Sequence, residues 1–216
     1  PTTATRVRTG RGSRRGARRG GASVIRRGWS AGAQQMQANS SGIQNVKLQE
    51  ESQIVVFLED EPYASFGRHW VESGSRGERR TNAYICAFSH GDACPLCDEG
   101  NRPQSVSAFN VGLIGDDGEV VLRSLDVGPR MYGVLKSYAT DAKIGPLTKG
   151  YYAMSKRGVG KNTTHSVIPL SGAVLEADYD VEEPSGSVLE GLGLYTADDI
   201  SITPQSELRK AAESLD

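Results

Sequence analysis

All three cysteines of the chain lie within twelve residues, and this clustering constrains the fold more than any other feature of the sequence. The run from Cys86 to Cys97 reads CAFSHGDACPLC, in which seven residues separate Cys86 from Cys94 and Cys94-Pro95-Leu96-Cys97 is a C-x-x-C knuckle. Structural zinc sites are closed and tetrahedral, with cysteine and histidine ligands. The run therefore predicts one structural Zn²⁺ ion bound by Cys86, Cys94, Cys97 and one histidine.

Two histidines are candidates for the fourth ligand. His90 lies between Cys86 and Cys94, and His69 lies in an aromatic run over residues 65–71. Spacing alone leaves both open. A thioredoxin-like redox pair is a weaker interpretation, since that motif sits near a βαβ unit and none is visible here. Three cysteines cannot all form disulfide bonds within one chain, so a secreted disulfide framework is also a poor interpretation. Inert buried thiols are the remaining alternative.

The charges of the chain are concentrated at its two ends. The formal net charge is −1, but residues 1–49 hold nine Arg, one Lys and no acidic residue, whereas residues 171–216 hold eleven acidic residues and two basic ones. Such asymmetry is typical of nucleic-acid interaction through a basic tail, with an acidic tail opposing it.

Composition favours a folded centre with polar ends, since apolar residues make up 37% of the 216-residue chain. Residues 1–28, rich in Gly, Ser and Arg, are predicted to form a disordered basic arm that binds phosphates or is simply solvated. Residues 29–170 are expected to form the core, beginning with a short helix or ordered linker over 29–49. Residues 171–216 are expected to form an acidic tail with a terminal helix over 204–215, which docks partner proteins or is solvated.

Nothing in the sequence points to a membrane. No apolar run approaches the roughly 18 residues that cross a bilayer, and the N-terminal residues have no apolar signal-peptide core. Together with unpaired cysteines, this predicts a reducing, cytoplasmic compartment.

The centre of the chain reads as short strands and one helix, so a mainly β (β-rich α+β) fold is expected. β-Branched and aromatic runs predict the strands, and Asp116-Asp117-Gly118 predicts a hairpin turn. Apolar residues at helical spacing predict a helix over 130–140. The best-fitting architecture is an OB-fold-like Greek-key barrel with a zinc-binding subdomain. The predicted strands span 52–59, 65–71, 81–88, 105–114, 119–125, 151–155 and 163–170.

Basic and aromatic residues are interleaved in three groups, as in proteins that follow phosphates with cations and stack bases on rings. Core packing is the alternative for each ring, and solubility is the alternative for each cation. Tyr151 and Tyr152 are neighbours on a strand and point to opposite faces, so at most one of them should stack on a base. The predicted contacts are Arg68, Trp70, Arg79, Arg80 and Tyr84 before the cysteine run, Tyr132, Lys136 and Tyr138 on the helix, and Tyr151, Tyr152, Lys156, Arg157 and Lys161 in the last hairpin.

The order His69, Cys86, Cys94-Pro-Leu-Cys97 resembles the zinc subdomain of the T-even phage helix-destabilising protein family. Runs over 56–64, 66–70, 108–111 and 125–130 are similar to those of single-stranded DNA-binding proteins from other tailed phages, so the resemblance covers about residues 28–170.

This resemblance implies His69 as the fourth ligand and a zinc-bearing OB-fold in a bacterial host cytoplasm. It implies sequence-independent coating of single-stranded DNA during phage replication, recombination and repair. It also implies cooperative self-association along the strand, and an acidic tail that contacts replication and recombination proteins and competes with DNA.

An enzyme is not expected, because a closed zinc site has no open position for water. Zinc deaminases carry H-x-E, and the spacing in His69-Trp70-Val71-Glu72 is different. A phosphate-binding G-x-x-x-x-G-K-[ST] loop is also absent from the sequence. The alternative function is a zinc-stabilised phage adaptor that binds a host or phage protein such as RNA polymerase.

Overall fold

The computed structural model describes residues 42–74 and 80–215, with the backbone only at Lys161. The predictions for the arm over 1–28, for most of the linker over 29–49 and for Arg79 lie outside the described residues. From Gly42 onward the chain forms one compact unit.

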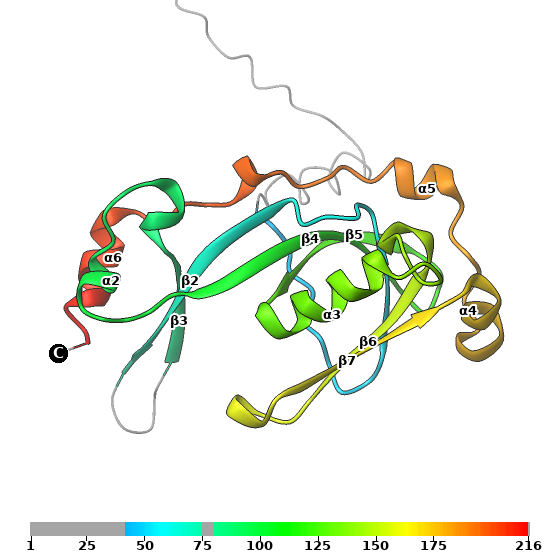
Figure 1. Ribbon diagram of the computed structural model, residues 1–216, viewed down its shortest axis with the longest axis horizontal. Coiled ribbons are helices and arrows are strands. Elements are labelled where there is room, and N and C mark those ends of the chain that lie inside the picture. Colours follow the sequence, from blue (N-terminus) through cyan, green and yellow to red (C-terminus); the bar gives the residue numbers. More distant parts are fainter. Residues whose placement is uncertain (1–41, 75–79, 216) are drawn as a thin grey trace, which may run out of the picture. The chain divides into compact units, whose positions relative to one another are not determined.

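Seven antiparallel strands form a single sheet (Figure 1), and each coincides with a strand predicted from the sequence. The sheet order is β3-β2-β4-β1-β6-β7, and β5 pairs with β4 as a branch from this path. A mainly β fold is thus confirmed. The strands are β1 (Gln53–Phe57), β2 (Ala64–Ser73), β3 (Arg80–Ile85), β4 (Gln104–Ile114), β5 (Val120–Val127), β6 (Tyr151–Arg157) and β7 (Thr164–Leu170).

The long strand β4 joins the two halves of the sheet. Its first half pairs with β2, with Phe66 opposite Val106, and its second half pairs on the same edge with β1, with Val55 opposite Leu113. Its other edge pairs with β5 through the predicted hairpin turn. The metal-binding run therefore lies in an excursion, β2 to β3 and onward, between β1 and β4.

The predicted closure of the sheet into a barrel is not observed. Closure would require β7 to pair with β5, and the described residues form no such pair. The outer edge of β5 instead bonds to the segment before β1, where Val46 N–H donates to Ser124 O and Ser124 N–H donates to Gln44 O, both at 2.8 Å. The helix α3 (Pro129–Thr140), predicted over 130–140, packs its Met131 and Leu135 into the core beside β5.

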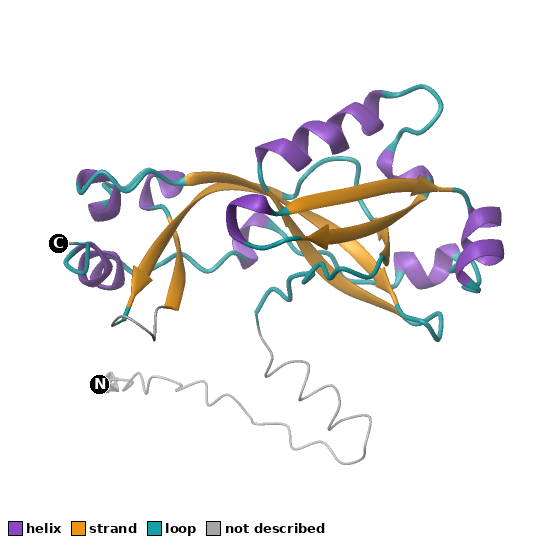
Figure 2. Ribbon diagram, turned by 90° about the horizontal axis from the view of Figure 1, so that it is seen from below, coloured by secondary structure: helices purple, strands orange, loops and turns teal. Residues whose placement is uncertain are grey.

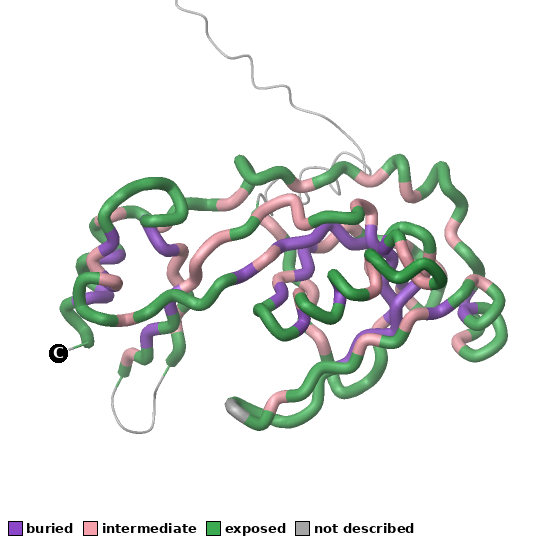
Figure 3. The backbone as a smooth tube through the Cα atoms, viewed as in Figure 1, coloured by how far each residue is buried: buried purple, intermediate pink, exposed green. Residues whose placement is uncertain are grey.

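Both faces of β1 are buried because each is covered by a different element. Val55 and Phe57 face the core under α3, where the Phe57 ring meets the rings of Phe109 and Tyr152 edge-on at centroid distances of 5.6 and 5.1 Å. Ile54 and Val56 face a second core that includes residues following β7. Figure 3 shows the buried positions concentrated in these central strands and again near α2 and α6.

Residues after β7 contain more helix than the sequence indicated. In addition to the predicted terminal helix α6 (Gln205–Ala212), they form α4 (Gly172–Tyr179), α5 (Gly186–Glu190) and the 3-10 turn η4 (Ala197–Asp199). Leu175 and Val181 pack on the β1 face, and the Ser171 side chain caps α4 by accepting from Val174 N–H. The first part of the segment predicted as an acidic tail therefore packs against the core through Leu175 and Val181. No helix among the described residues has the length and apolarity needed to cross a bilayer.

Phe57→Ala should lower the free energy of unfolding by about 3–5 kcal/mol, because it leaves a cavity between two aromatic rings in the main core. Val159→Ala is the control, since Val159 is 87% exposed and its truncation should change stability by less than about 0.5 kcal/mol. Urea denaturation followed by far-UV circular dichroism measures both. Equal losses in the two variants would contradict this assignment of the core.

Candidate metal centre

Three separate segments bring one histidine and three cysteines together. His69 comes from β2, Cys86 directly follows β3, and Cys94 and Cys97 belong to the knuckle, where Cys94 caps the four-residue helix α2 (Pro95–Asp98). One ligand atom from each of the four lies within 4.8 Å of all the others. The predicted set His69, Cys86, Cys94 and Cys97 is therefore assembled as a single candidate metal site.

Three distances within the cluster match those expected around one tetrahedral ion. His69 Nε2 lies 3.3 Å from Cys94 Sγ and 3.6 Å from Cys97 Sγ, and Cys86 Sγ lies 3.6 Å from Cys97 Sγ. Four ligands around zinc, with bonds of about 2.0–2.3 Å, lie about 3.3–3.8 Å from one another. His90, in contrast, ends the exposed 3-10 turn η1 (Ala87–His90) and is not in the cluster. The geometry favours His69 over His90 as the fourth ligand.

A side chain that the sequence analysis did not assign orients the histidine. Asn101 Oδ1 lies 3.1 Å from His69 Nδ1, and Asn101 Nδ2 donates to Trp70 O at 3.2 Å. With Nε2 directed at the ion, Nδ1 carries the proton and donates to Asn101, which is how second-shell partners hold a histidine ligand. In the sequence Asn101 is visible only as part of the turn Asn101-Arg102-Pro103.

β2 packs closely against the chain after β3 at a glycine. Cys86 N–H donates to Gly67 O at 2.9 Å, and a Cβ at Gly67 would lie 3.1 Å from Cys86 Cβ and 3.0 Å from Pro103 Cβ. A side chain at this position would require Cys86 or Pro103 to shift by a few tenths of an ångström. The glycine in the aromatic run thus sets the approach of two ligand-bearing segments.

The thiols favour a bound cation. Burial, and then hydrogen bonds with the Cys86 and Cys94 thiols, raise the pKa of the Cys97 thiol to about 12. Burial also raises the pKa of Cys94, but hydrogen bonds with the backbone of Cys97 and Ala87 outweigh it and leave that pKa below its ordinary value. Like charges this close oppose one another. A divalent cation would offset that repulsion, because its positive charge stabilises the thiolates that coordinate it.

The C-terminal helix completes the small core around the cluster. Leu208, Ala211 and Ala212 of α6 are buried against Val71 and Leu96, which flank the ligands. Figures 1 and 2 both show α6, next to the C-terminus, beside the short helix α2. The terminal helix, predicted to dock partner proteins or to be solvated, therefore packs its apolar residues inside the chain, apart from Leu215, which is 39% exposed.

On the opposite face of β2 lies a row of aromatic and cationic side chains. Phe66, Arg68 and Trp70 alternate with His69 and Val71 along the strand, so they point away from the cluster. The Arg68 guanidinium lies 5.2 Å from the Phe66 ring centroid and 5.9 Å from that of Trp70. The row thus combines one cation with two rings on one face.

Two hydrogen bonds hold this row. Arg68 donates to Asp126, and Trp70 Nε1 donates to Gln104 Oε1 at 3.2 Å. Trp70 is still 44% exposed. The predicted contacts Arg68 and Trp70 thus lie side by side, with Trp70 exposed and Arg68 partly buried in its ion pair with Asp126. Tyr84 packs on the core beside the cluster, and Arg80 is exposed at the start of β3.

The predicted aromatic contacts outside β2 and β3 are used in the core. Tyr132 and Tyr138 are partly buried on α3, and Tyr138 donates to Val167 O. Tyr151 and Tyr152 are 5% and 1% exposed. The prediction is revised for these two, because β6 lies inside the sheet and both of its faces are covered.

The predicted basic contacts on α3 and at the end of β6 lie at the surface. Lys136 is exposed on α3, and Lys156 and Arg157 are exposed at the end of β6, where the β6–β7 hairpin projects. These side chains are on different elements from the Phe66–Arg68–Trp70 row.

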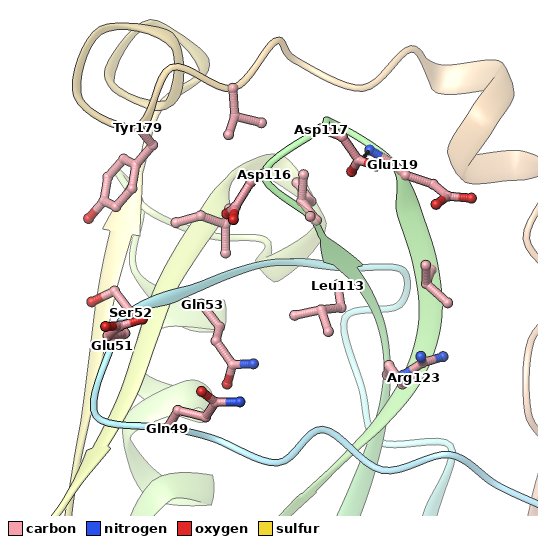
Figure 4. A pocket seen from close by; sticks show the side chains of 15 residues that line it. Gln49, Glu51, Ser52, Gln53, Leu113, Asp116, Asp117, Glu119, Arg123 and Tyr179 are labelled. Atoms are coloured by element: carbon pink, nitrogen blue, oxygen red, sulfur yellow. Dashed lines mark hydrogen bonds between the residues drawn. The ribbon is translucent and has the colours of Figure 1, made fainter.

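A separate cavity of about 340 Å³ lies at the hairpin end of β4 and β5 (Figure 4). Its carboxylates outnumber its single arginine, Arg123, so it does not suit a polyanion. It shares no residue with the metal cluster. The acidic residues that line it are Glu51, Asp116, Asp117 and Glu119.

The chain was also compared with protein families, with curated proteins and with solved structures. None of the three comparisons found a match. The function is therefore inferred from the chain's own residues and their geometry.

Cys94→Ser should abolish stoichiometric metal binding and lower the free energy of unfolding by at least about 3 kcal/mol, since loss of a structural metal belongs to the most damaging class of changes. His69→Ala should do the same. His90→Ala is the matched control and should keep one metal ion per chain. Elemental mass spectrometry and thermal melting measure the outcomes. Metal loss in His90→Ala with retention in His69→Ala would overturn the ligand assignment.

Proposed function

We propose that this chain is a sequence-independent single-stranded DNA-binding protein whose metal centre holds one structural Zn²⁺ ion. The observation that supports the proposal is the Phe66–Arg68–Trp70 row on β2, in which Trp70 is 44% exposed and Phe66 and Arg68 are partly buried. Rings and guanidinium planes stack on bases of any sequence, at about 1–3 kcal/mol per base. A partly exposed tryptophan beside an arginine on a strand face is suited to this use.

Zinc is the ion of choice for this donor set. Three thiolates and one imidazole, buried together, match structural Cys₃His sites. The four side chains fill all positions around a tetrahedral ion, and the proposed role of the metal is accordingly to stabilise the fold. We propose no catalysis at this site.

The strand order supports an OB-fold-like arrangement. The strands β1, β4, β5, β6 and β7, with α3 between β5 and β6, follow the chain order of a five-stranded OB-fold that is partly open. Such folds bind oligonucleotides on the face of their second and third strands and on the loops between strands one and two and between four and five. The first of these loops corresponds here to the β2–β3 excursion, which bears the aromatic row. The second corresponds to the basic β6–β7 turn.

The first test is a fluorescence titration of the full chain with labelled oligo-dT and with a matching duplex, at about 50 and 200 mM salt. We expect tight binding that favours the single strand and that weakens about tenfold or more over this salt range, because each phosphate contact on a single strand contributes about −0.7 to the salt slope. Failure to bind the single strand at low salt would contradict the proposal and leave the zinc-stabilised adaptor.

Trp70→Ala should weaken single-strand affinity by about 5- to 150-fold, the range expected for loss of one stacked base. Phe88→Ala is the matched control, because Phe88 is also an exposed ring, 58% accessible, but lies on η1 outside the row. Metal content should be unchanged in both variants. Equal affinities of the two variants would remove the row from the binding site.

A further inference from the structure

The chain between α5 and α6, residues 191–203, crosses the sheet and is named here the strap (Figure 1). Its central contact is a two-way clamp on β4. Tyr195 N–H donates to Asn110 Oδ1 at 3.0 Å, and Asn110 Nδ2 donates to Tyr195 O at 2.9 Å. Gln44 N–H donates to the Tyr195 hydroxyl, and the Tyr195 ring lies 6.2 Å from that of Tyr63. Asn110 is fully buried beneath the strap.

The strap covers the face of the sheet that carries the aromatic row. Phe66 pairs with Val106, and Val106, Ala108 and Asn110 alternate onto one face of β4. Trp70 on β2 and Asn110 on β4 therefore lie on the same face of the sheet. The strap covers this face at Asn110.

The far end of the strap is held at the metal centre. Thr203 Oγ1 accepts from Ile85 N–H at 2.8 Å, and Gln205 Nε2 donates to Ala93 O at 2.9 Å, one residue before Cys94. The buried Leu208 then packs on a surface built from ligand-bearing segments. Leu96 lies between two ligands, and Ala87 follows a third.

Part of this surface lies outside the sheet. Val71 belongs to β2, whereas Leu96 and Ala87 belong to two four-residue helical turns, α2 and η1, that are not part of the sheet. Four ligand bonds converging on one ion would hold these turns in place, as in small metal domains whose folding is coupled to metal binding.

We propose that metal binding and strap closure are coupled, so that loss of the metal releases α6 and the strap from the sheet and exposes the face around Asn110. A coupling of this kind is reciprocal: the metal strengthens docking of α6 by the same factor by which docked α6 strengthens metal binding. The proposed coupling does not depend on which ligand the exposed face binds.

The test is hydrogen exchange of the full chain under reducing conditions, zinc-loaded and after chelation, with metal content checked by elemental mass spectrometry. On chelation, peptides from the strap and α6 should exchange at least about tenfold faster, while peptides from β6 and β7 should be unchanged. Unchanged strap or α6 exchange in metal-free protein would overturn the proposal. Equal acceleration in β6 and β7 would also overturn it, because it would signify general unfolding.

A second experiment approaches the coupling from the helix. Leu208→Asp should release α6 and, by reciprocity, weaken the zinc affinity of the chain by about tenfold, measured by equilibrium competition with a chelator. Leu215→Asp is the matched control, since Leu215 is 39% exposed beyond the end of α6, and its zinc affinity should equal that of the unmodified chain. Released α6 in Leu208→Asp with an unchanged zinc affinity would disprove the coupling.

Discussion

The convergence of His69, Cys86, Cys94 and Cys97 is the constraint on which one end of the molecule depends. Its ligands come from a strand, from the residue after an edge strand and from a single helical turn, and few apolar side chains surround them. So small a core supplies little stabilisation of its own, and small domains of this kind commonly rely on a metal. The main β core, with Phe57 at its centre, has no such need.

The alternation of β2 gives this end two different faces. His69 and Val71 face the His/Cys cluster, and Phe66, Arg68 and Trp70 face the other way as a row held by Asp126 and Gln104. His69 and Trp70 are thus adjacent in sequence but lie on opposite faces of β2. The proposed binding surface and the candidate metal site therefore share one strand without contacting each other.

The sequence predicted the elements well and their environments less well. β-Branched and aromatic runs located all seven strands, and the spacing of the cysteines located the site, because strand pairing and metal coordination leave strong local patterns. Burial of Tyr151 and Tyr152 was not visible, since it follows from the place of β6 inside the sheet, between β1 and β7. The clamp between Asn110 and Tyr195 joins residues 85 positions apart, and neither residue type signals the other. The helices α4 and α5 were not predicted, because they are short and lie in an acidic segment without clear helical periodicity.

One edge of β4 pairs with two different strands along its length. The ladder to β2 ends at Ala108 and the ladder to β1 begins at Val111, so this edge passes from one partner strand to the other across Phe109 and Asn110. Only β5, on the opposite edge, runs unbroken past this junction. The junction separates the end of the sheet that bears the His/Cys cluster from the end that α3 covers. Asn110 at this junction is also the residue that exchanges hydrogen bonds with Tyr195, so the strap is attached where β4 changes its partner strand.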